Sequence, residues 1–318
     1  MFRIFAPRKN DTQMNKKLRG GIFVFLGACS FGLLSTIVKK AYAQDYNLGE
    51  ITGSQTLFGT FFLWLIYYLQ LNFGVVKKTR KHEFSGQEQK TATKWWKVLF
   101  AGTFTGLVGM FYYKCVSLLP ASIAIILLMQ YLWMSIILDA LIFKKKPTRI
   151  QILATAVVLI GTIFAGGIFN QTITLNMVGI IYGLLAALSY ALFILCSGRV
   201  GNDLPVFKKS ALMITGSFIL TWVVFRPTFL FDGVFISGLY KWGIALALLG
   251  TVIPPLFFSI GVPKVGISVG TILSAAELPI AVLSSYFILQ ENVQTLQWLG
   301  VILILISIIM SNLIKEKK

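Results

Sequence analysis

The stretch Gly266-Ile-Ser-Val-Gly-Thr-Ile-Leu-Ser-Ala-Ala-Glu277-Leu-Pro279 holds one carboxylate deep inside an apolar run that continues to Leu289. In water such a glutamate would be ordinary. Near the middle of a membrane span, an ionisable side chain is costly and marks a functional site by default. Glu277 is therefore a candidate for binding a ligand or carrying a proton. The alternative is that it only pairs with a neighbouring helix.

Small or hydroxylated residues surround Glu277 at helical spacing, namely Gly270, Ser274, Ala281 and Ser284. Side chains of this size let helices approach closely or line a water-filled cavity, so this face is not expected to meet lipid. Pro279 lacks a backbone N–H and is expected to bend the helix beside the charge. Ser274 is therefore a second candidate pathway residue.

The composition is that of a membrane protein, since 56% of the 318 residues are hydrophobic, 13% are charged and the mean hydropathy is +0.79. The net charge of +18 does not indicate nucleic-acid binding, because Lys and Arg lie in short clusters between long apolar runs. The cysteines lie in separate apolar runs, and His82 is the only histidine. The sequence therefore predicts neither a metal site nor a disulfide framework.

Apolar runs of about 20 residues mark candidate membrane spans. There are ten: residues 20–38, 51–73, 97–118, 121–143, 150–169, 175–197, 209–230, 239–261, 267–289 and 294–314. With the N-terminus in the cytoplasm, most of the 29 Lys and Arg residues fall on the cytoplasmic side, and only Lys39, Lys40, Arg226 and Lys241 fall outside. This asymmetry predicts an all-α integral membrane protein with ten transmembrane helices and both termini cytoplasmic.

The two halves of the chain align at an offset of 146 residues. Ser122 then matches Ser268, Gln151 matches Gln297, and the joint at residues 143–145 matches residues 289–291. Five spans is an odd number, so the second copy enters the membrane inverted relative to the first, and a site is expected near the midplane between them. The predicted division is a basic tail (1–19), a first repeat (20–169), a second repeat (175–314) and a short C-terminal tail (315–318).

The second repeat resembles the EamA-type ten-helix carriers of the drug/metabolite transporter superfamily. The resemblance rests on the small-residue helix, Glu277-Leu-Pro279, Leu289-Gln-Glu291 and Gln297-Trp-Leu-Gly300. In the first repeat Ala121-Ser122-Ile-Ala124, Gln151 and Gly161 fit, whereas Lys145 stands where the family usually has Glu. The resemblance implies two four-helix half-bundles around a central pathway, with spans five and ten at the periphery and available for a homodimer. It implies no cofactor.

Lys114 is the second charge inside a span, near the external end of the third. It is predicted either to face the pathway, holding a substrate carboxylate or pairing with Glu277, or to reach the membrane interface with its long side chain.

Further polar and aromatic candidates lie on the second, fourth and sixth spans and on the first. Gln55 and Gln130 can donate or accept hydrogen bonds, and Tyr131 aligns with Glu277 under the repeat offset. Their alternative role is helix-to-helix hydrogen bonding. Trp133 is on the same side of its helix as Gln130 and is expected either to stack on a substrate or to pack against lipid or protein. Hydroxyl groups expected to line the cavity include those of Tyr190 and Ser35.

These features predict a secondary transporter that exports a small organic metabolite by alternating access around a midplane site. Amino acids or related amphipathic compounds are the first substrate class, with possible proton coupling through Glu277. The alternatives are a broad exporter of aromatic or cationic drugs, a nucleotide-sugar or sugar-phosphate carrier, and an intramembrane enzyme, for which no activated nucleophile or metal cluster stands at useful spacing. The expected partners are the substrate and the lipid bilayer, and the short tails favour a bacterial cytoplasmic membrane.

Overall fold

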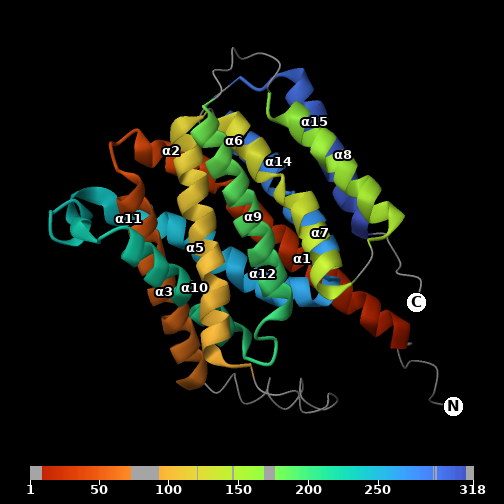
Figure 1. The fold of residues 1–318 in the computed structure, drawn as a ribbon, viewed down its shortest axis with the longest axis horizontal. Helices are drawn as coiled ribbons and strands as arrows, with labels where there is room; N and C mark the ends of the chain where they lie inside the picture. Colours follow the sequence, from red (N-terminus) through yellow and green to blue (C-terminus); the bar gives the residue numbers. More distant parts are fainter. Residues whose placement is uncertain are drawn as a thin grey trace.

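The computed structural model describes residues 9–72, 93–119, 121–144, 147–167, 176–288, 290 and 292–312. Over these ranges the regular secondary structure is entirely helical, as the apolar patterning predicts (Figure 1). His82, Lys145 and Glu291, which entered the sequence interpretation, lie outside the described residues.

Each predicted span corresponds to one helix or to consecutive helical segments. The first repeat contains α1 (Lys9–Gly32), α2 (Leu34–Tyr42), α3 (Leu48–Asn72), α5 (Trp95–Leu118), α6 (Ala121–Leu128), α7 (Tyr131–Phe143) and α8 (Arg149–Ala165). The second contains α9 (Met177–Arg199), α10 (Val206–Val224), η2 (Thr228–Leu230), η3 (Phe235–Leu239), α11 (Tyr240–Leu246), η4 (Ala247–Val252), α12 (Ile253–Val265), α13 (Ile267–Ser274), α14 (Glu277–Ile288) and α15 (Thr295–Asn312).

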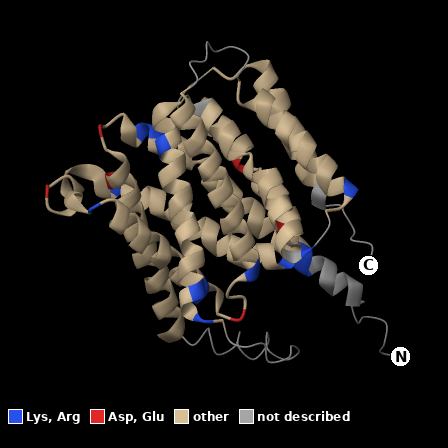
Figure 2. Ribbon diagram, in the orientation of Figure 1, with Lys and Arg blue, Asp and Glu red and all other residues tan. Residues whose placement is uncertain are grey.

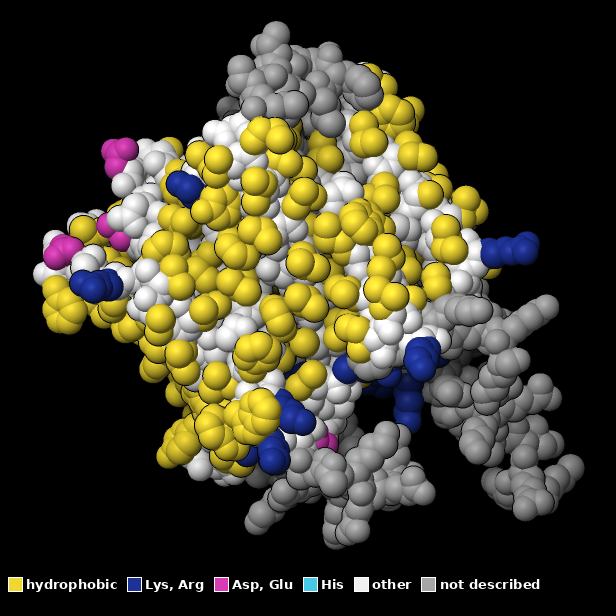
Figure 3. Space-filling model, viewed as in Figure 1, with side chains coloured by type: hydrophobic (Ala, Val, Ile, Leu, Met, Phe, Trp, Pro, Cys, Tyr) yellow, Lys and Arg dark blue, Asp and Glu magenta, His cyan; other side chains and the backbone are white. Residues whose placement is uncertain are grey.

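Six helical stretches of the described chain are long and apolar enough to cross a membrane: Lys16–Tyr42, Ile123–Ile142, Met177–Arg199, Val206–Val224, Phe235–Val265 and Ile267–Ile288. Arg149–Ala165 and Thr295–Ile309 are shorter apolar helices. Figure 3 shows apolar side chains spread over the middle of this face and the charged side chains toward its edges, as expected for a surface in contact with lipid. The chain is therefore a multi-span helical membrane protein, while the count of ten crossings and the cytoplasmic termini stay predictions.

Charge separates the two ends of the bundle (Figure 2). We call the end where α1 begins and α15 finishes the basic end. It carries most of the described Lys and Arg residues, among them Lys94, Lys97, Lys144, Arg149, Lys208 and Lys264. The opposite end carries Lys39, Lys40, Arg226 and Lys241 together with acidic residues.

The 146-residue offset recurs in the local structure. Lys144 and Gln290 both have a left-handed backbone, with φ of 53° and 55°. The backbone N–H of Thr148 donates to the Gln151 side chain at 2.8 Å, and that of Gln294 donates to Gln297 at 2.9 Å, so the same cap begins α8 and α15. Two copies of one sequence pattern thus form the same turn and the same cap.

The helix pairs with the closest packing join the two repeats. α1 lies along α12, α5 lies between α9 and α10, and α8 pairs with α15 at one flank of the bundle (Figure 1). On α5, a Cβ at Gly102 would stand 1.8 Å from the Met213 carbonyl oxygen, and a Cβ at Gly216 of α10 would stand 1.8 Å from that of Leu99. Only glycine permits this backbone approach.

Lys209 near the start of α10 is buried with 2% of its surface exposed, although its position suggests an ordinary loop lysine. Its ammonium donates to the Ser197 carbonyl oxygen at 2.7 Å and to the Asn202 side chain at 2.8 Å, so it completes the last turn of α9. Asp203 in the adjoining loop accepts hydrogen bonds from the hydroxyl and the backbone N–H of Thr93. Partial burial raises the pKa of this carboxyl, but the Thr93 hydrogen bonds outweigh that and hold it below its usual range.

Candidate functional site

A cavity lies inside the bundle, and the empty space in it and at its open mouth together comes to about 670 Å³. Its lining comes from α1, α2, α3, α5, α6, α9, η4 and α14. Gln55 near the start of α3, Tyr113 near the end of α5 and Ile125 in α6 all belong to helix segments remote from the basic end. The cavity therefore extends from the middle of the bundle toward the opposite end.

Glu277 contributes a carboxylate to this cavity. It is 4% exposed and begins α14, where a helix N-terminus favours negative charge. Its Oε2 accepts a hydrogen bond from the Tyr190 hydroxyl at 3.1 Å, whereas its buried Oε1 has no hydrogen-bond partner. A buried unpaired carboxylate oxygen is unfavourable, so Oε1 is a ready acceptor for a proton or for the N–H of a ligand.

Both repeats interrupt a span at the same position. α6 ends at Leu128 and α7 begins at Tyr131, just as α13 ends at Ser274 and α14 begins at Glu277. Pro279 cannot donate to the carbonyl of Ala275, which accounts for part of the second interruption. The first repeat has Trp133 at the equivalent position, so proline is not required for the break. The result is that Tyr131 and Glu277 each start a half-helix near the centre of the bundle.

Tyr131 and Ser274 lie beside the Glu277–Tyr190 pair. The Tyr131 and Ser274 hydroxyls are 2.9 Å apart, and the Tyr131 ring centroid is 4.3 Å from that of Tyr190. All four side chains are buried. Tyr131 and Ser274 are therefore behind the cavity surface and support the residues that face it.

An aromatic cluster separates the cavity from the basic end. Phe31 contacts Tyr190 and Phe258 with ring centroids 5.6 Å and 5.9 Å apart, and Phe193 is 5.8 Å from Phe258. Phe193 belongs to the half of α9 nearer the basic end, and Phe258 lies at the middle of α12. These rings provide apolar contact area for a bound molecule and close the floor of the cavity.

Polar groups are few on the remaining walls. The Tyr113 hydroxyl donates to Gln55 Oε1 at 3.1 Å, which leaves the Gln55 amide nitrogen as a donor. Thr251 and Ser35 add hydroxyls, and the Ser35 hydroxyl points back to the Gly32 carbonyl at 3.4 Å. Most of the lining is apolar or aromatic, as in sites for small amphipathic molecules.

Four of the residues proposed from the sequence line the cavity: Ser35, Gln55, Tyr190 and Glu277. Gln130, Trp133 and Lys114 are not among the lining residues. The Trp133 indole donates to Gln130 Oε1 at 2.9 Å, and Trp133 is 39% exposed, so these two side chains pair with each other on the outside of α7. Lys114 is half-buried on another face of α5, and no Lys or Arg lines the cavity within the described chain.

Sequence reasoning missed the aromatic side chains Phe31, Tyr112, Tyr113 and Phe193. In the motif Phe111-Tyr-Tyr-Lys114, the charge suggested Lys114 as the site residue. The two preceding tyrosines, Tyr112 and Tyr113, line the cavity instead. Helical position could have separated Lys114 from Tyr112 and Tyr113, because neighbours in a helix point in different directions.

Comparison with known families matches the EamA-like transporter family over residues 18–167 and again over residues 177–313. The chain belongs to the EamA-like transporter family. This membership makes the protein a membrane transporter of small molecules, and it gives no support to the intramembrane-enzyme alternative.

Individual relatives of this transporter agree with that result. A protein of Synechocystis sp. named as an uncharacterized transporter is 24% identical over 324 aligned residues, covering 94% of both chains. A solved crystal structure superposes with a TM-score of 0.68 at 13% identity, covering 92% of this chain and 98% of that one. At that identity the superposition shows a shared fold only.

Proposed function

We propose that this transporter is a secondary carrier that exports a small amphipathic amine by alternating access, with Glu277 as the binding and proton-exchange site. The observation that carries the proposal is Glu277 Oε1, which has no hydrogen-bond partner and lies in a cavity lined mostly by apolar and aromatic side chains. A proton and a substrate ammonium group would both neutralise this carboxylate. Because only one can occupy it at a time, their competition provides a physical route to proton-coupled exchange.

The orientation follows from the charge distribution. The positive-inside rule assigns the basic end to the cytoplasm, so the cavity would open toward the outside. Membership of a transporter family with a cyanobacterial relative supports a bacterial cytoplasmic membrane.

The exposed flank of α8 and α15 is the proposed surface for a homodimer.

Amino acids and related compounds stay the first substrate class, since the amide nitrogen of Gln55 could donate to a substrate carboxylate in the same cavity as Glu277. One observation favours the second candidate class, aromatic or cationic compounds without a carboxylate. Lys114 does not line the cavity, so a zwitterion would meet no cationic side chain among the described lining residues. The five lining aromatic rings would suit either class.

A matched set of substrates would separate these candidates. Counterflow would be measured in proteoliposomes with phenylalanine, its amine phenethylamine and its acid phenylpropionate, with and without a pH gradient. Exchange of phenylalanine and phenethylamine but not phenylpropionate would show that the amine is recognised. Phenethylamine alone would select the cationic class. Exchange of phenylpropionate alone would contradict an amine site at Glu277.

Substituting Glu277→Gln should abolish this exchange, because the amide keeps the size of the side chain but cannot bind a cation or release a proton. We expect counterflow to fall at least about tenfold, equivalent to about 1.4 kcal/mol, and its remaining rate to lose dependence on pH. Glu50→Gln, at the half-buried start of α3 and outside the cavity lining, is the matched control and should keep the wild-type rate. A correctly folded Glu277→Gln protein with the normal rate and pH dependence would remove Glu277 from the mechanism.

A further inference from the structure

Three polar residues form a stripe on α7. Tyr131, Ser135 and Asp139 are spaced four residues apart, so they lie on one face of the helix. All three are buried, with 0%, 0% and 4% of their surface exposed. Sequence patterning singled out Tyr131 for the site.

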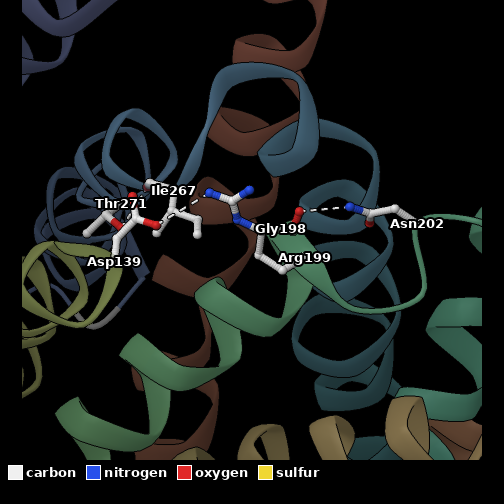
Figure 4. A network of polar contacts seen from close by, with 6 residues as sticks. All are labelled: Asp139, Gly198, Arg199, Asn202, Ile267 and Thr271. Carbon is white, nitrogen blue, oxygen red and sulfur yellow. Dashed lines mark hydrogen bonds and ion pairs between the residues drawn. The ribbon is translucent and has the colours of Figure 1, made fainter. Parts of the chain in front are cut away.

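Each residue of this stripe contacts the second repeat. The Tyr131 hydroxyl lies 2.9 Å from that of Ser274, and the Ser135 hydroxyl donates to Thr271 Oγ1 at 2.8 Å. Asp139 pairs with Arg199 at the end of α9, with Oδ1 and the guanidinium nitrogen 3.6 Å apart (Figure 4). We call these three contacts the α7 latch.

The α7 latch lies between the cavity and the basic end. Tyr131 begins α7 beside Glu277, and Asp139 and Arg199 lie close to the last turns of α7 and α9. Figure 4 shows Asp139 and Thr271 together on one side of the Arg199 guanidinium. The latch therefore joins α7 to α13 and α9 along the path by which a cavity ligand would reach the basic end.

The repeat supplies a counterpart to this contact. At the 146-residue offset, Tyr131 and Ser135 correspond to Glu277 and Ala281 on α14. Thr271 and Ser274 correspond to Ile125 and Leu128 on α6. All four counterparts line the cavity. The same helix-to-helix contact is thus closed toward the basic end and open toward the opposite end.

We propose that the α7 latch is the gate on the basic side, and that its counterpart, Ile125 and Leu128 against Glu277 and Ala281, is the gate on the other side. One closes as the other opens. This inference rests on the proposed alternating access. It goes beyond it by naming the two sets of side chains that must exchange contact.

The two gates differ in chemistry, and this difference couples closure of one gate to neutralisation of Glu277. The α7 latch closes through hydroxyl and ion-pair contacts that need no ligand. Its counterpart would press Ile125 and Leu128 onto the Glu277 carboxylate. Glu277 is already buried beside the cavity, and closing the gate would remove the space in which a neutralising partner can reach its unpaired oxygen. Enclosing an uncompensated charge between aliphatic side chains is strongly unfavourable. The counterpart gate therefore closes only when a proton or a bound cation neutralises Glu277, which prevents the empty, ionised carrier from changing sides.

Paired cysteines would test the exchange of contacts in a protein with Cys29, Cys115 and Cys196 replaced by alanine. The pair Ser135→Cys with Thr271→Cys should form a disulfide readily under mild oxidation. Counterflow of the substrate identified above should then fall at least tenfold and return on reduction. The single variants Ser135→Cys and Thr271→Cys are the matched controls, since neither can form the cross-link.

The pair Ile125→Cys with Ala281→Cys should cross-link slowly in the resting protein. It should cross-link faster with substrate present than without it at the same pH, since the reacting thiolate fraction is then equal, and not at all when the 135–271 disulfide is already closed. Normal counterflow by the 135–271 cross-linked protein would overturn the latch. Equal 125–281 cross-linking with the latch open and closed would overturn the exchange of gates.

Failure of the carrier proposal itself would look different. In that case the wild-type protein would exchange no member of the substrate panel. Failure of the latch alone would leave wild-type exchange intact and make it insensitive to the 135–271 disulfide.

Discussion

At the scale of single residues, Tyr190 determines how Glu277 is presented. Its hydroxyl donates a hydrogen bond to Glu277 Oε2, and its ring contacts the rings of Phe31 and Tyr131. The carboxylate is thus held by one oxygen and available through the other. Sequence reasoning placed Tyr190 on the cavity but could not pair it with Glu277, because the two are 87 residues apart in the chain.

Substituting Tyr190→Phe removes only this hydroxyl and keeps the aromatic packing. A hydrogen bond to a charged group contributes about 1.5–3 kcal/mol, so the released carboxylate should bind substrate less well. We expect the KM for counterflow to rise by about tenfold, and the melting temperature to fall because the second buried oxygen of Glu277 loses its partner. Tyr182→Phe, on the same helix but outside the cavity lining, should leave KM unchanged. Equal KM values in the two variants would contradict the positioning role.

At the scale of elements, the contact between α5 and α10 depends on Gly102 and Gly216, whose missing Cβ atoms let the two backbones touch. α5 also carries Gly109, which faces the cavity, and a Cβ there would have no neighbour within 4 Å. Glycine therefore has a different structural effect at these two positions of α5. The first is a packing residue, and the second leaves the cavity open.

Substituting Gly102→Ala should separate α5 from α10, because the new Cβ would overlap the Met213 carbonyl. Overpacking of this kind destabilises by about 1–3 kcal/mol. The melting temperature of the detergent-solubilised protein should fall accordingly, as followed by size-exclusion chromatography after heating. Gly109→Ala is the matched control and should be neutral or slightly stabilising, since alanine favours helix by about 1 kcal/mol over glycine. The same loss in both variants would argue against the backbone contact.

At the scale of the whole molecule, the closest helix pairs join the two repeats: α1 with α12, α5 with α9 and α10, and α8 with α15. The repeats are therefore interleaved, and alternating access cannot be a simple hinge between one half of the sequence and the other. The basic end and the opposite end differ mainly in charge (Figure 2).

Cysteine labelling would test the orientation that this charge difference predicts. In the protein lacking native cysteines, Asp232→Cys at the opposite end should react with a membrane-impermeant maleimide in intact cells. Lys144→Cys at the basic end should react only after the membrane is permeabilised. Both positions are exposed, so access from the two sides of the membrane is the variable measured. The reverse labelling pattern would contradict the predicted topology.

The sequence by itself determined the membrane class, the helical fold and the repeat offset, and it singled out Glu277 as a candidate. These follow from local signals, namely apolar run length, charge clusters and a carboxylate where lipid would otherwise be expected. Repeat alignment placed Tyr131, and helical spacing placed Ser274, in the same zone as Glu277, and the structure has their hydroxyls in contact.

Only the tertiary structure decided which faces meet. It turned Lys114, Gln130 and Trp133 away from the cavity, brought Tyr112, Tyr113 and Phe193 into it, and paired Asp139 with Arg199. A pattern of apolar residues leaves the rotation of each helix open when nearly every face is apolar. Packing between distant segments, such as the glycine contact of α5 with α10, fixes that rotation. It thereby determines which side chains line the cavity.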